Sequence, residues 1–272
     1  MLVWFIGGAL IAPANHPIGN PPADLPVQNV QFSSASGSAI HGWLVTAPSG
    51  TNAIKGVVVL MHGIHASRMA MISRAELLYH AGYSVLLFDF QAHGESPGKI
   101  ITIGYLESRD ATAAVNFVRQ KFPGQKVGVI GESMGAAAAL LADPPLPVDA
   151  MVLESCYPTI NQAVNDRLKI RFGVLSNLGT PLLLWQLKPR LGFGPEALGP
   201  IDQAAKLTVP KFFIAGTADR NTTEQESKDL YNAAAGPKQF WLVENAGHVD
   251  MFRFTGDEYK NRVMEFLARY LN

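Results

Sequence analysis

Gly131-Glu132-Ser133-Met134-Gly135 lies between a short apolar run, 127–130, and an alanine-rich stretch that continues to residue 142. The apolar run is typical of a buried strand and the alanines favour a helix, so these five residues form a strand-to-helix turn. Glycines two positions before and after a serine allow a turn sharp enough to lift the hydroxyl off the sheet. We interpret Ser133 as a nucleophile. The alternative is a plain helix N-cap.

Similar apolar runs alternate with helical patterns along most of the chain. The predicted strands cover residues 57–61, 85–88, 126–130, 150–153, 211–215 and 238–243, and the predicted helices cover about 68–81, 102–121, 133–142, 222–234 and 255–270. A hairpin of 27–33 and 39–46 precedes them. Runs that are apolar on both faces predict a mostly parallel central sheet with helices on both faces, an α/β fold. Ligands of such sheets bind beyond the carboxyl ends of the strands.

Composition narrows the class of protein. The 272 residues are 48% hydrophobic and 16% charged, with 22 basic and 22 acidic side chains, which suits one large domain. The balanced charge argues against a nucleic-acid partner. A single cysteine, Cys156, excludes an internal disulfide framework and a thiolate zinc cluster. No metal constellation or phosphate-binding loop appears, so we expect no cofactor.

The N-terminus differs from the rest of the chain. Residues 1–12 are apolar or glycine, fewer than the roughly 20 that a spanning helix needs. Three interpretations stay open: an arm docked on the domain, the remnant of a longer signal or anchor, and a segment lying on a membrane. Prolines at 13, 17, 21, 22 and 26 predict an extended linker. We therefore expect an arm and linker over 1–26 and the folded domain over 27–272.

A serine nucleophile needs a base and an acid from elsewhere in the chain. His248 is the favoured base because it follows the strand 238–243 in the loop Glu244-Asn245-Ala246-Gly247-His248, with His65 as a reserve. Asp219 is the favoured acid, because it follows the strand 211–215, with Glu154 as the runner-up. The order Ser133, Asp219, His248 is the one expected when the serine sits in such a turn.

The developing negative charge on a substrate oxygen needs two N–H donors. One is the backbone N–H of Met134, at the start of the helix. The other is expected from Ile64, because His62-Gly63-Ile64 follows the strand 57–61 and a glycine permits a loop that aims the next N–H into the site. His62 is then a structural residue and not the base.

Over about residues 30–272 the sequence resembles the α/β-hydrolase family of serine esterases and lipases. The resemblance rests on His62-Gly63, Asp89 to Ser96, Gly131 to Gly135, Asp219 and Gly247-His248. Relatives usually have Asp-x-Arg-Gly-His-Gly-x-Ser where this chain has Asp89-Phe90-Gln91-Ala92-His93-Gly94-Glu95-Ser96, so Gln91 and Ala92 depart from the pattern. The resemblance implies an α/β-hydrolase fold and cofactor-free acyl transfer through an acyl-enzyme, with a structural role for the Asp89 segment.

An insertion of about 155–207 follows the sixth strand and is longer than one crossover helix needs. We interpret it as a small helical cap; a pair of core-packing helices is the alternative. Its apolar side chains predict a substrate pocket, with Leu182 and Trp185 as binding residues among Leu175, Leu178, Leu183 and Leu187. Basic residues flank this apolar centre, so the cap and residues 1–12 also permit peripheral membrane contact.

Three functions are compatible with these residues. The first is a serine hydrolase that cleaves small-molecule carboxylic esters of short to medium acyl chain. The second is a thioesterase or peptidase with the same triad. The third, from another class, is a ligand receptor that reuses the fold without turnover. The sequence leaves the oligomeric state open.

Overall fold

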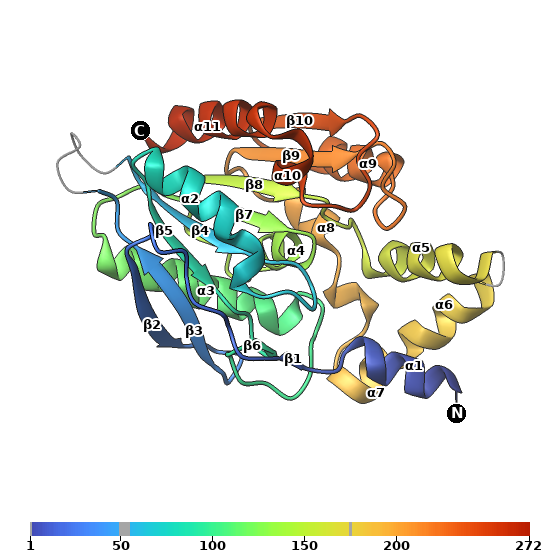
Figure 1. Cartoon of the computed structure of the whole chain (residues 1–272). Helices are drawn as coiled ribbons and strands as arrows, with labels where there is room; N and C mark the ends of the chain where they lie inside the picture. The colour runs from blue at the N-terminus through green and yellow to red at the C-terminus, as the bar shows by residue number, and fades with distance from the viewer. Residues whose placement is uncertain (1, 49–54, 174–175) are drawn as a thin grey trace.

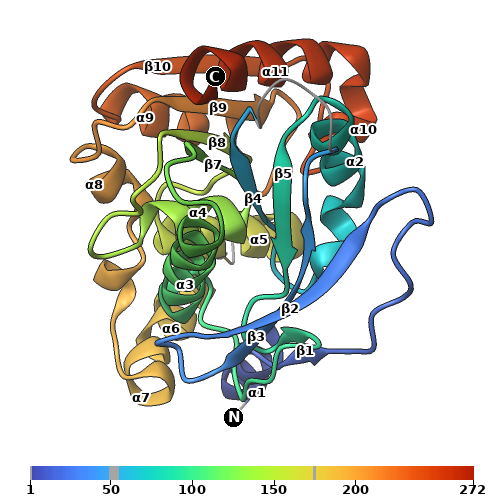
Figure 2. The same ribbon diagram turned by 90° about the vertical axis from the view of Figure 1, so that its left-hand side faces the viewer.

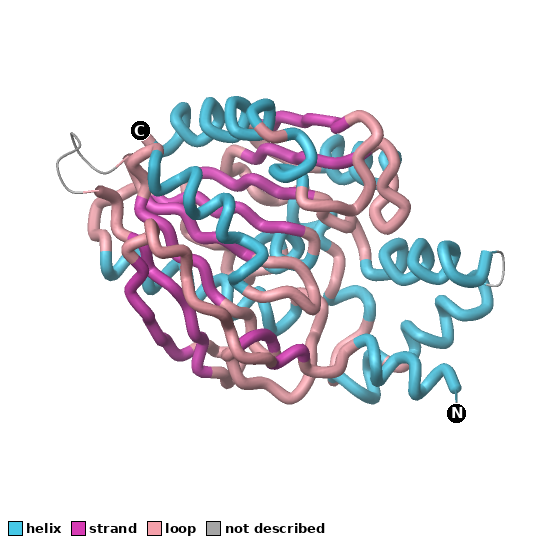
Figure 3. Tube along the Cα trace, viewed as in Figure 1, coloured by secondary structure: helices cyan, strands magenta, loops and turns pink. Residues whose placement is uncertain are grey.

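The computed structural model describes residues 2–48, 55–173 and 176–272. Its central feature is an eight-stranded sheet with helices packed on both faces (Figures 1 and 3). The strands are β2 (Val27–Ser33), β3 (Ala39–Val45), β4 (Val57–Met61), β5 (Ser84–Phe88), β7 (Val127–Glu132), β8 (Ala150–Glu154), β9 (Lys211–Gly216) and β10 (Lys238–Val243). The α/β architecture predicted from the sequence is confirmed.

The strand order across the sheet is β10-β9-β8-β7-β4-β5-β3-β2. Neighbours from β10 to β5 are parallel, whereas β3 is antiparallel to both β5 and β2. The predicted hairpin is present, with Ser33 paired to Ala39 across its turn. Because the parallel strands all end at one edge, the loops after β4, β7, β9 and β10 meet there.

Successive residues of the central strands face opposite sides of the sheet. In β4, Val57, Val59 and Met61 belong to one buried apolar cluster, and Val58 and Leu60 belong to the other. Every residue of this strand is buried. Two helical layers therefore explain why the strand sequences are apolar throughout instead of alternating.

The helices divide between these two clusters. One face is covered by α3 (Tyr105–Lys121), α4 (Met134–Leu140), α8 (Pro200–Ala204) and α9 (Glu224–Ala233), and the other by α2 (Ile72–His80), α10 (Met251–Thr255) and α11 (Asp257–Leu271). Figure 2 separates α3 and α4, on the left of β4 and β5, from α2 on their right. The core is thus double, with the sheet between its halves.

The observed helix bounds differ from those predicted by apolar periodicity, and at three places a local cause is visible. The helix expected from 68 starts as a 3-10 turn, η1 (Arg68–Met71), before α2. The helix expected from 102 starts at Tyr105, because Gly104 has φ +114° and its N–H donates to the Glu107 carboxylate at 2.8 Å. The last helix is divided by Gly256, at φ +56°, into α10 and α11.

The insertion between β8 and β9 is helical. It consists of α5 (Ile160–Phe172), α6 (Ser176–Trp185), α7 (Leu187–Leu191) and η3 (Pro195–Ala197), followed by α8. α5 begins after Thr159, whose hydroxyl oxygen accepts the N–H of Gln162 at 3.3 Å. α5 and α6 extend away from the sheet at one end of the molecule (Figure 1). The insertion therefore lies beyond the carboxyl ends of the strands.

The N-terminal arm lies against this cap. α1 (Leu2–Leu10) contacts α6, and its Gly7 and Gly8 face the side chains of Gln186 and Arg190. The proline-rich segment that follows contains β1 (Ala14–Asn15), which pairs in parallel with β6 (His93–Gly94). Among the described helices, none has the length and apolar character needed to cross a bilayer.

Candidate active site

Ser133 occupies the turn between β7 and α4. Its backbone adopts φ +51° and ψ −110°, a conformation that costs a non-glycine residue on the order of 1–3 kcal/mol. The turn is held because the Ser133 N–H donates to the carbonyl oxygen of Glu154, at the end of β8, at 2.8 Å. Neighbouring strands therefore hold a strained residue in place, as is common at functional sites.

The two flanking glycines are required by close packing. A Cβ on Gly131 would lie 2.6 Å from the backbone nitrogen of Ala136, and a Cβ on Gly135 would lie 2.3 Å from the carbonyl oxygen of Met61. Backbone atoms cannot move aside as a flexible side chain would, so neither position accepts a larger residue. Their absence of side chains lets the first turn of α4 sit directly on the end of β4.

His248 connects the hydroxyl of Ser133 to a buried carboxylate. Its Nε2 lies 3.1 Å from the Oγ of Ser133, and its Nδ1 lies 2.7 Å from Oδ2 of Asp219. Since a carboxylate only accepts, Nδ1 carries the proton and Nε2 presents its lone pair to the hydroxyl. The Asp219 side chain is buried, while that of His248 is 22% exposed. Solvent therefore reaches the imidazole but not the carboxylate.

Asp219 is oriented by the loop that follows β9. Its Oδ1 accepts the backbone N–H groups of Asn221 at 2.8 Å and Thr222 at 3.0 Å. Two fixed donors on one oxygen leave the other to face His248. The Asp219 carboxylate therefore caps its own loop through Oδ1 and faces the imidazole through Oδ2.

Glu154, the alternative acid, lies in a different environment. Its carboxylate accepts from Arg74 through Nε at 3.1 Å and Nη2 at 2.6 Å, and from the hydroxyl of Tyr259. All three side chains are buried. The structure thus brings Asp219 to His248 and assigns Glu154 to a separate polar network.

The loop after β4 passes beside the serine. A Cβ on Gly63 would lie 3.7 Å from the Cβ of Ser133. Within residues 2–48, 55–173 and 176–272, the backbone N–H groups of Ile64 and Met134 make no hydrogen bond. Both N–H groups that the sequence indicated as donors are therefore unpaired in the described part of the chain.

Two histidines hold this loop and are not bases. His62 has Nδ1 2.7 Å from the carbonyl oxygen of Gly63, and its Nε2 accepts the N–H of Phe90 at 3.1 Å. Complete burial, followed by the charge of His93, lowers the pKa of His62 to about 3. His93 in turn accepts the N–H of His65 at 3.1 Å through Nε2, and burial lowers its pKa as well. Both rings are therefore neutral and hold the loop through hydrogen bonds. His65, the reserve base, contributes its backbone N–H to one of them.

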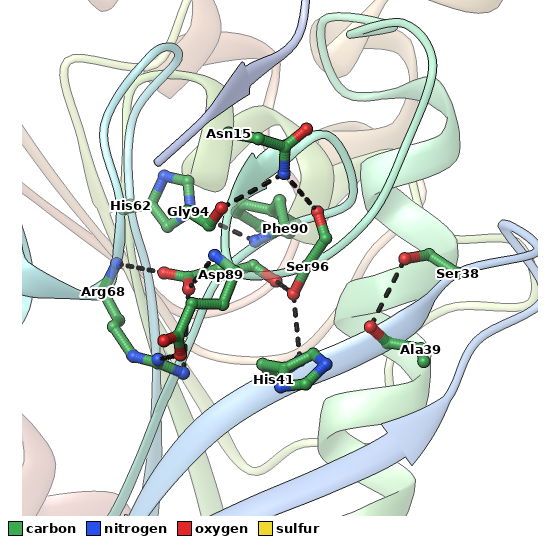
Figure 4. A network of polar contacts seen from close by, with 11 residues as sticks. Asn15, Ser38, Ala39, His41, His62, Arg68, Asp89, Phe90, Gly94 and Ser96 are labelled. Carbon is green, nitrogen blue, oxygen red and sulfur yellow. Dashed lines mark hydrogen bonds and ion pairs between the residues drawn. The ribbon is translucent and has the colours of Figure 1, made fainter. Parts of the chain in front are cut away.

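The segment Asp89–Ser96 is a compact hydrogen-bonded turn (Figure 4). The Asp89 carboxylate accepts the backbone N–H of Arg68 at 2.7 Å and that of Glu95 at 3.0 Å. The hydroxyl of Ser96 donates to the Asp89 carbonyl at 2.7 Å and accepts the N–H of His41 at 2.9 Å. The segment therefore ties the loop after β5 to β3 and to η1.

The two departures from the usual pattern are accommodated within this turn. Ala92 has φ +59°, so it adopts the left-handed backbone in which glycine is usual. Gln91 donates through Nε2 to the Glu107 carboxylate at 2.7 Å and to the Ile100 carbonyl at 2.8 Å. The amide of Gln91 therefore bridges this turn to α3.

The apolar side chains of the insertion, from which the sequence predicts a substrate pocket, differ widely in exposure. Leu182 is 53% exposed and Trp185 is 69% exposed, whereas Leu183 and Leu187 are both 8% exposed. The reason is helical phase. One side of α6 packs against the rest of the protein, so residues next to it in the sequence face solvent. Leu175 lies outside the described residues.

Two charged residues near the site carried no recognisable signal in the sequence. Arg167 of α5 donates through Nη1 to the carbonyls of Ala163 at 2.9 Å and Asn221 at 3.5 Å, so it joins the cap to the Asp219 loop. Burial lowers its pKa, and the charge of Asp219 opposes that shift. Burial, then the charge of Glu154, raises the pKa of Glu132 in the serine turn. In the described ranges no group of three His, Cys, Asp or Glu side chains is arranged to hold a metal ion.

Known proteins that are similar to this chain support the fold assignment and a hydrolase activity. The chain is 27% identical over 238 residues to uncharacterized protein YqkD of Bacillus subtilis, covering 86% of this chain and 77% of that protein. It is 26% identical over 240 residues to human monoglyceride lipase, covering 74% and 77%. The solved esterase Pf2001 of Pyrococcus furiosus has a TM-score of 0.78 at 25% identity, covering 96% of this chain and 100% of that one.

A family model extends the agreement over the middle of the chain. Residues 52–192, more than half of the sequence, match the model described as serine aminopeptidase, S33. The matched range begins before β4 and includes the Ser133 turn and most of the cap helices. The chain therefore belongs to the serine aminopeptidase S33 family of α/β hydrolases and is a hydrolase.

Proposed function

We propose that this hydrolase cleaves carboxylic esters, with Ser133 as nucleophile, His248 as general base and Asp219 as the acid that orients the base. One observation carries the proposal: an unbroken line of contacts, 2.7 Å from Asp219 to His248 and 3.1 Å from His248 to Ser133. A serine hydroxyl is a poor nucleophile until a base accepts its proton, and this line supplies the base in the required tautomer.

The reaction has two balanced halves. The Oγ of Ser133 attacks the ester carbonyl carbon while its proton moves to Nε2 of His248, and the carbonyl oxygen becomes an oxyanion facing the N–H groups of Ile64 and Met134. The intermediate collapses, and the leaving alcohol takes the proton from Nε2. Water then attacks the acyl-serine and gives a proton to the same nitrogen. Release of the acid returns that proton to Ser133.

The names of similar proteins support an oxygen ester as substrate, since they include an esterase and a monoglyceride lipase. A small-molecule ester with a short to medium acyl chain follows from our interpretation of the sequence. The description of the matching family favours a second candidate, a peptidase that uses the same three residues on an amide. A thioesterase would use identical chemistry with a thiol leaving group.

Fluorophosphonate labelling combined with a substrate panel tests the proposal. The panel contains p-nitrophenyl esters of increasing acyl length, an aminoacyl p-nitroanilide and an acyl thioester. We expect labelling of the wild type and rapid turnover of esters, both lost in Ser133→Ala. Ser227→Ala is the matched control, because Ser227 is a buried serine on α9.

Each other outcome identifies a competing function. Preferred turnover of the anilide supports the peptidase, and preferred turnover of the thioester supports the thioesterase. A wild type that neither labels nor turns over any substrate supports the receptor and contradicts catalysis by Ser133.

A further inference from the structure

A group of large apolar side chains covers the outer end of the cap. We call this group the apolar tip, and it comprises Trp4 and Phe5 of α1, Ile170 and Phe172 of α5, and Leu178, Leu182 and Trp185 of α6. The exposed fractions run from 39% for Ile170 to 72% for Leu178. Figure 1 shows that α1, the end of α5 and α6 lie together at one end of the molecule, with the N-terminus beside them.

The helical phase of α6 turns this face outward. Leu178, Leu182 and Trp185 follow the spacing i, i+4, i+7 and so lie along one side of the helix. The buried Leu183 lies on another side of the same helix. The fold thus uses one side of α6 for its own packing and leaves a second apolar side in solvent, which is unfavourable unless something else covers it.

α1 extends the same surface. It contacts α6, and the Arg190 guanidinium of α7 lies 3.8 Å from the centre of the Trp4 ring and donates to the Trp4 carbonyl. Gly7 and Gly8 of α1 lie against the side chains of Gln186 and Arg190. Although α1 contacts α6, Trp4 and Phe5 of α1 remain 42% and 69% exposed.

The exposed charge around the apolar tip is mainly basic, although Lys169 lies 3.9 Å from the carboxylate of the buried Asp166. Residues 167–195 contain five basic and no acidic side chains, and residues 1–23 contain no acidic side chain, although the whole chain has 22 of each. The Lys169 side chain is 56% exposed, and Arg171 and Lys188 are exposed as well. A cationic rim around an aromatic and aliphatic centre complements a surface with anionic headgroups above an apolar interior.

We propose that the apolar tip docks this protein on lipid bilayers that carry anionic headgroups. Trp4 and Trp185 would sit at headgroup depth, where indole rings are favoured, while the aliphatic side chains reach the acyl boundary. Lys169, Arg171 and Lys188 would face the phosphates. Docking in this sense is interfacial and requires no spanning helix. It goes beyond the proposed ester hydrolysis and does not depend on it.

Flotation of the full-length chain with vesicles tests the proposal. We expect binding to vesicles of phosphatidylcholine with phosphatidylglycerol, and weaker binding to phosphatidylcholine alone. The double variant Phe5→Glu/Phe172→Glu should lower the bound fraction at least tenfold. Phe254→Glu is the matched control, since Phe254 is 50% exposed on α10, outside the apolar tip. It should bind like the wild type.

The electrostatic part has its own variant pair. Lys169→Glu/Arg171→Glu should remove the preference for anionic vesicles, while Lys206→Glu/Lys260→Glu, at exposed positions elsewhere, should keep it. Raising the salt concentration should weaken wild-type binding to anionic vesicles toward that seen with phosphatidylcholine alone. Circular dichroism verifies that every variant is folded.

Three results would overturn the docking proposal. The first is a wild type that floats with no vesicle, and the second is equal binding by Phe5→Glu/Phe172→Glu and the wild type. The third concerns the oligomeric state measured by light scattering: the wild type is a dimer, the double variant is a monomer, and both bind vesicles equally. The apolar tip would then join two copies of the chain. Hydrolysis of a soluble ester is measured in parallel. Its loss from every sample would count against the proposed function while leaving the flotation result interpretable.

Discussion

The guanidinium of Arg74 lies 3.0 Å from the carboxylate of Asp250, two residues beyond His248. The same Nη2 atom lies 2.6 Å from Glu154, whose backbone carbonyl accepts the N–H of Ser133. A single buried cation from α2 therefore joins the loop that carries the candidate base to the strand that holds the candidate nucleophile. The three charged groups therefore connect the two segments that carry the candidate base and nucleophile.

Loss of this cation should destabilise the protein strongly. Arg74→Met leaves the fully buried Glu154 carboxylate without its partner, and we expect the free energy of unfolding to fall by about 3–5 kcal/mol. Urea denaturation measures the change. Arg269→Met, which breaks an exposed pair with Glu265, should cost less than about 1 kcal/mol. Similar losses in the two variants would show that burial of the Arg74 network contributes little.

Removal of the candidate nucleophile or base should nearly abolish turnover. Ser133→Ala and His248→Ala should each lower kcat by about 10⁴-fold or more, and the double variant should be little worse because the residues act as a unit. Steady-state kinetics on a soluble p-nitrophenyl ester provides the measurement. Multiplicative losses in the double variant would mean that the two side chains work independently.

Substitution by alanine should affect stability very differently at two glycines near the site. Gly135→Ala places a Cβ 2.3 Å from the carbonyl oxygen of Met61, and we expect a loss of at least about 3 kcal/mol, or failure to fold, because backbone must shift. Gly247→Ala meets no atom closer than 4.0 Å and should change stability by less than about 1 kcal/mol. Thermal and urea unfolding compare the pair. A stable Gly135→Ala protein would contradict the packing described for the serine turn.

Stability should depend on pH through Asp110. Burial raises the pKa of Asp110 from 3.8 to about 7, so between these values the folded state holds a proton that the unfolded chain has released. Stability is therefore lost as pH rises through this window, with a slope of at most about 1.4 kcal/mol per pH unit from this group. Asp110→Asn should gain stability relative to the wild type from pH 4 to pH 7, and the gain should level off above pH 7.

The control for this titration is Asp229→Asn, at an exposed position on α9. Its stability difference from the wild type should stay nearly constant over the same range. Urea midpoints measured at each pH give both differences. A flat difference for Asp110→Asn would show that the buried carboxyl does not retain its proton in the folded state.

Much of the fold is predictable because it depends on local patterns. Apolar runs and turn residues indicate the buried strands and the hairpin, and the structure has them at nearly the same bounds. The glycines around Ser133 are equally readable, since a sharp strand-to-helix turn restricts residue types within a few positions. Helix starts are predicted less accurately. Gly104 sets the start of α3 and Gly256 separates α10 from α11 through their backbone conformations, which apolar periodicity does not report.

The elements and the short motifs after the strands are thus specified locally, because neighbouring residues restrict the backbone directly. Which of those motifs meet depends on the packing of the whole chain. Ser133 and His248 are 115 positions apart, and it is the order of β7, β9 and β10 in the sheet that brings them to hydrogen-bonding distance. The Arg74 network and the outward face of α6 were equally unreadable in the sequence, since burial and exposure follow from how distant elements pack.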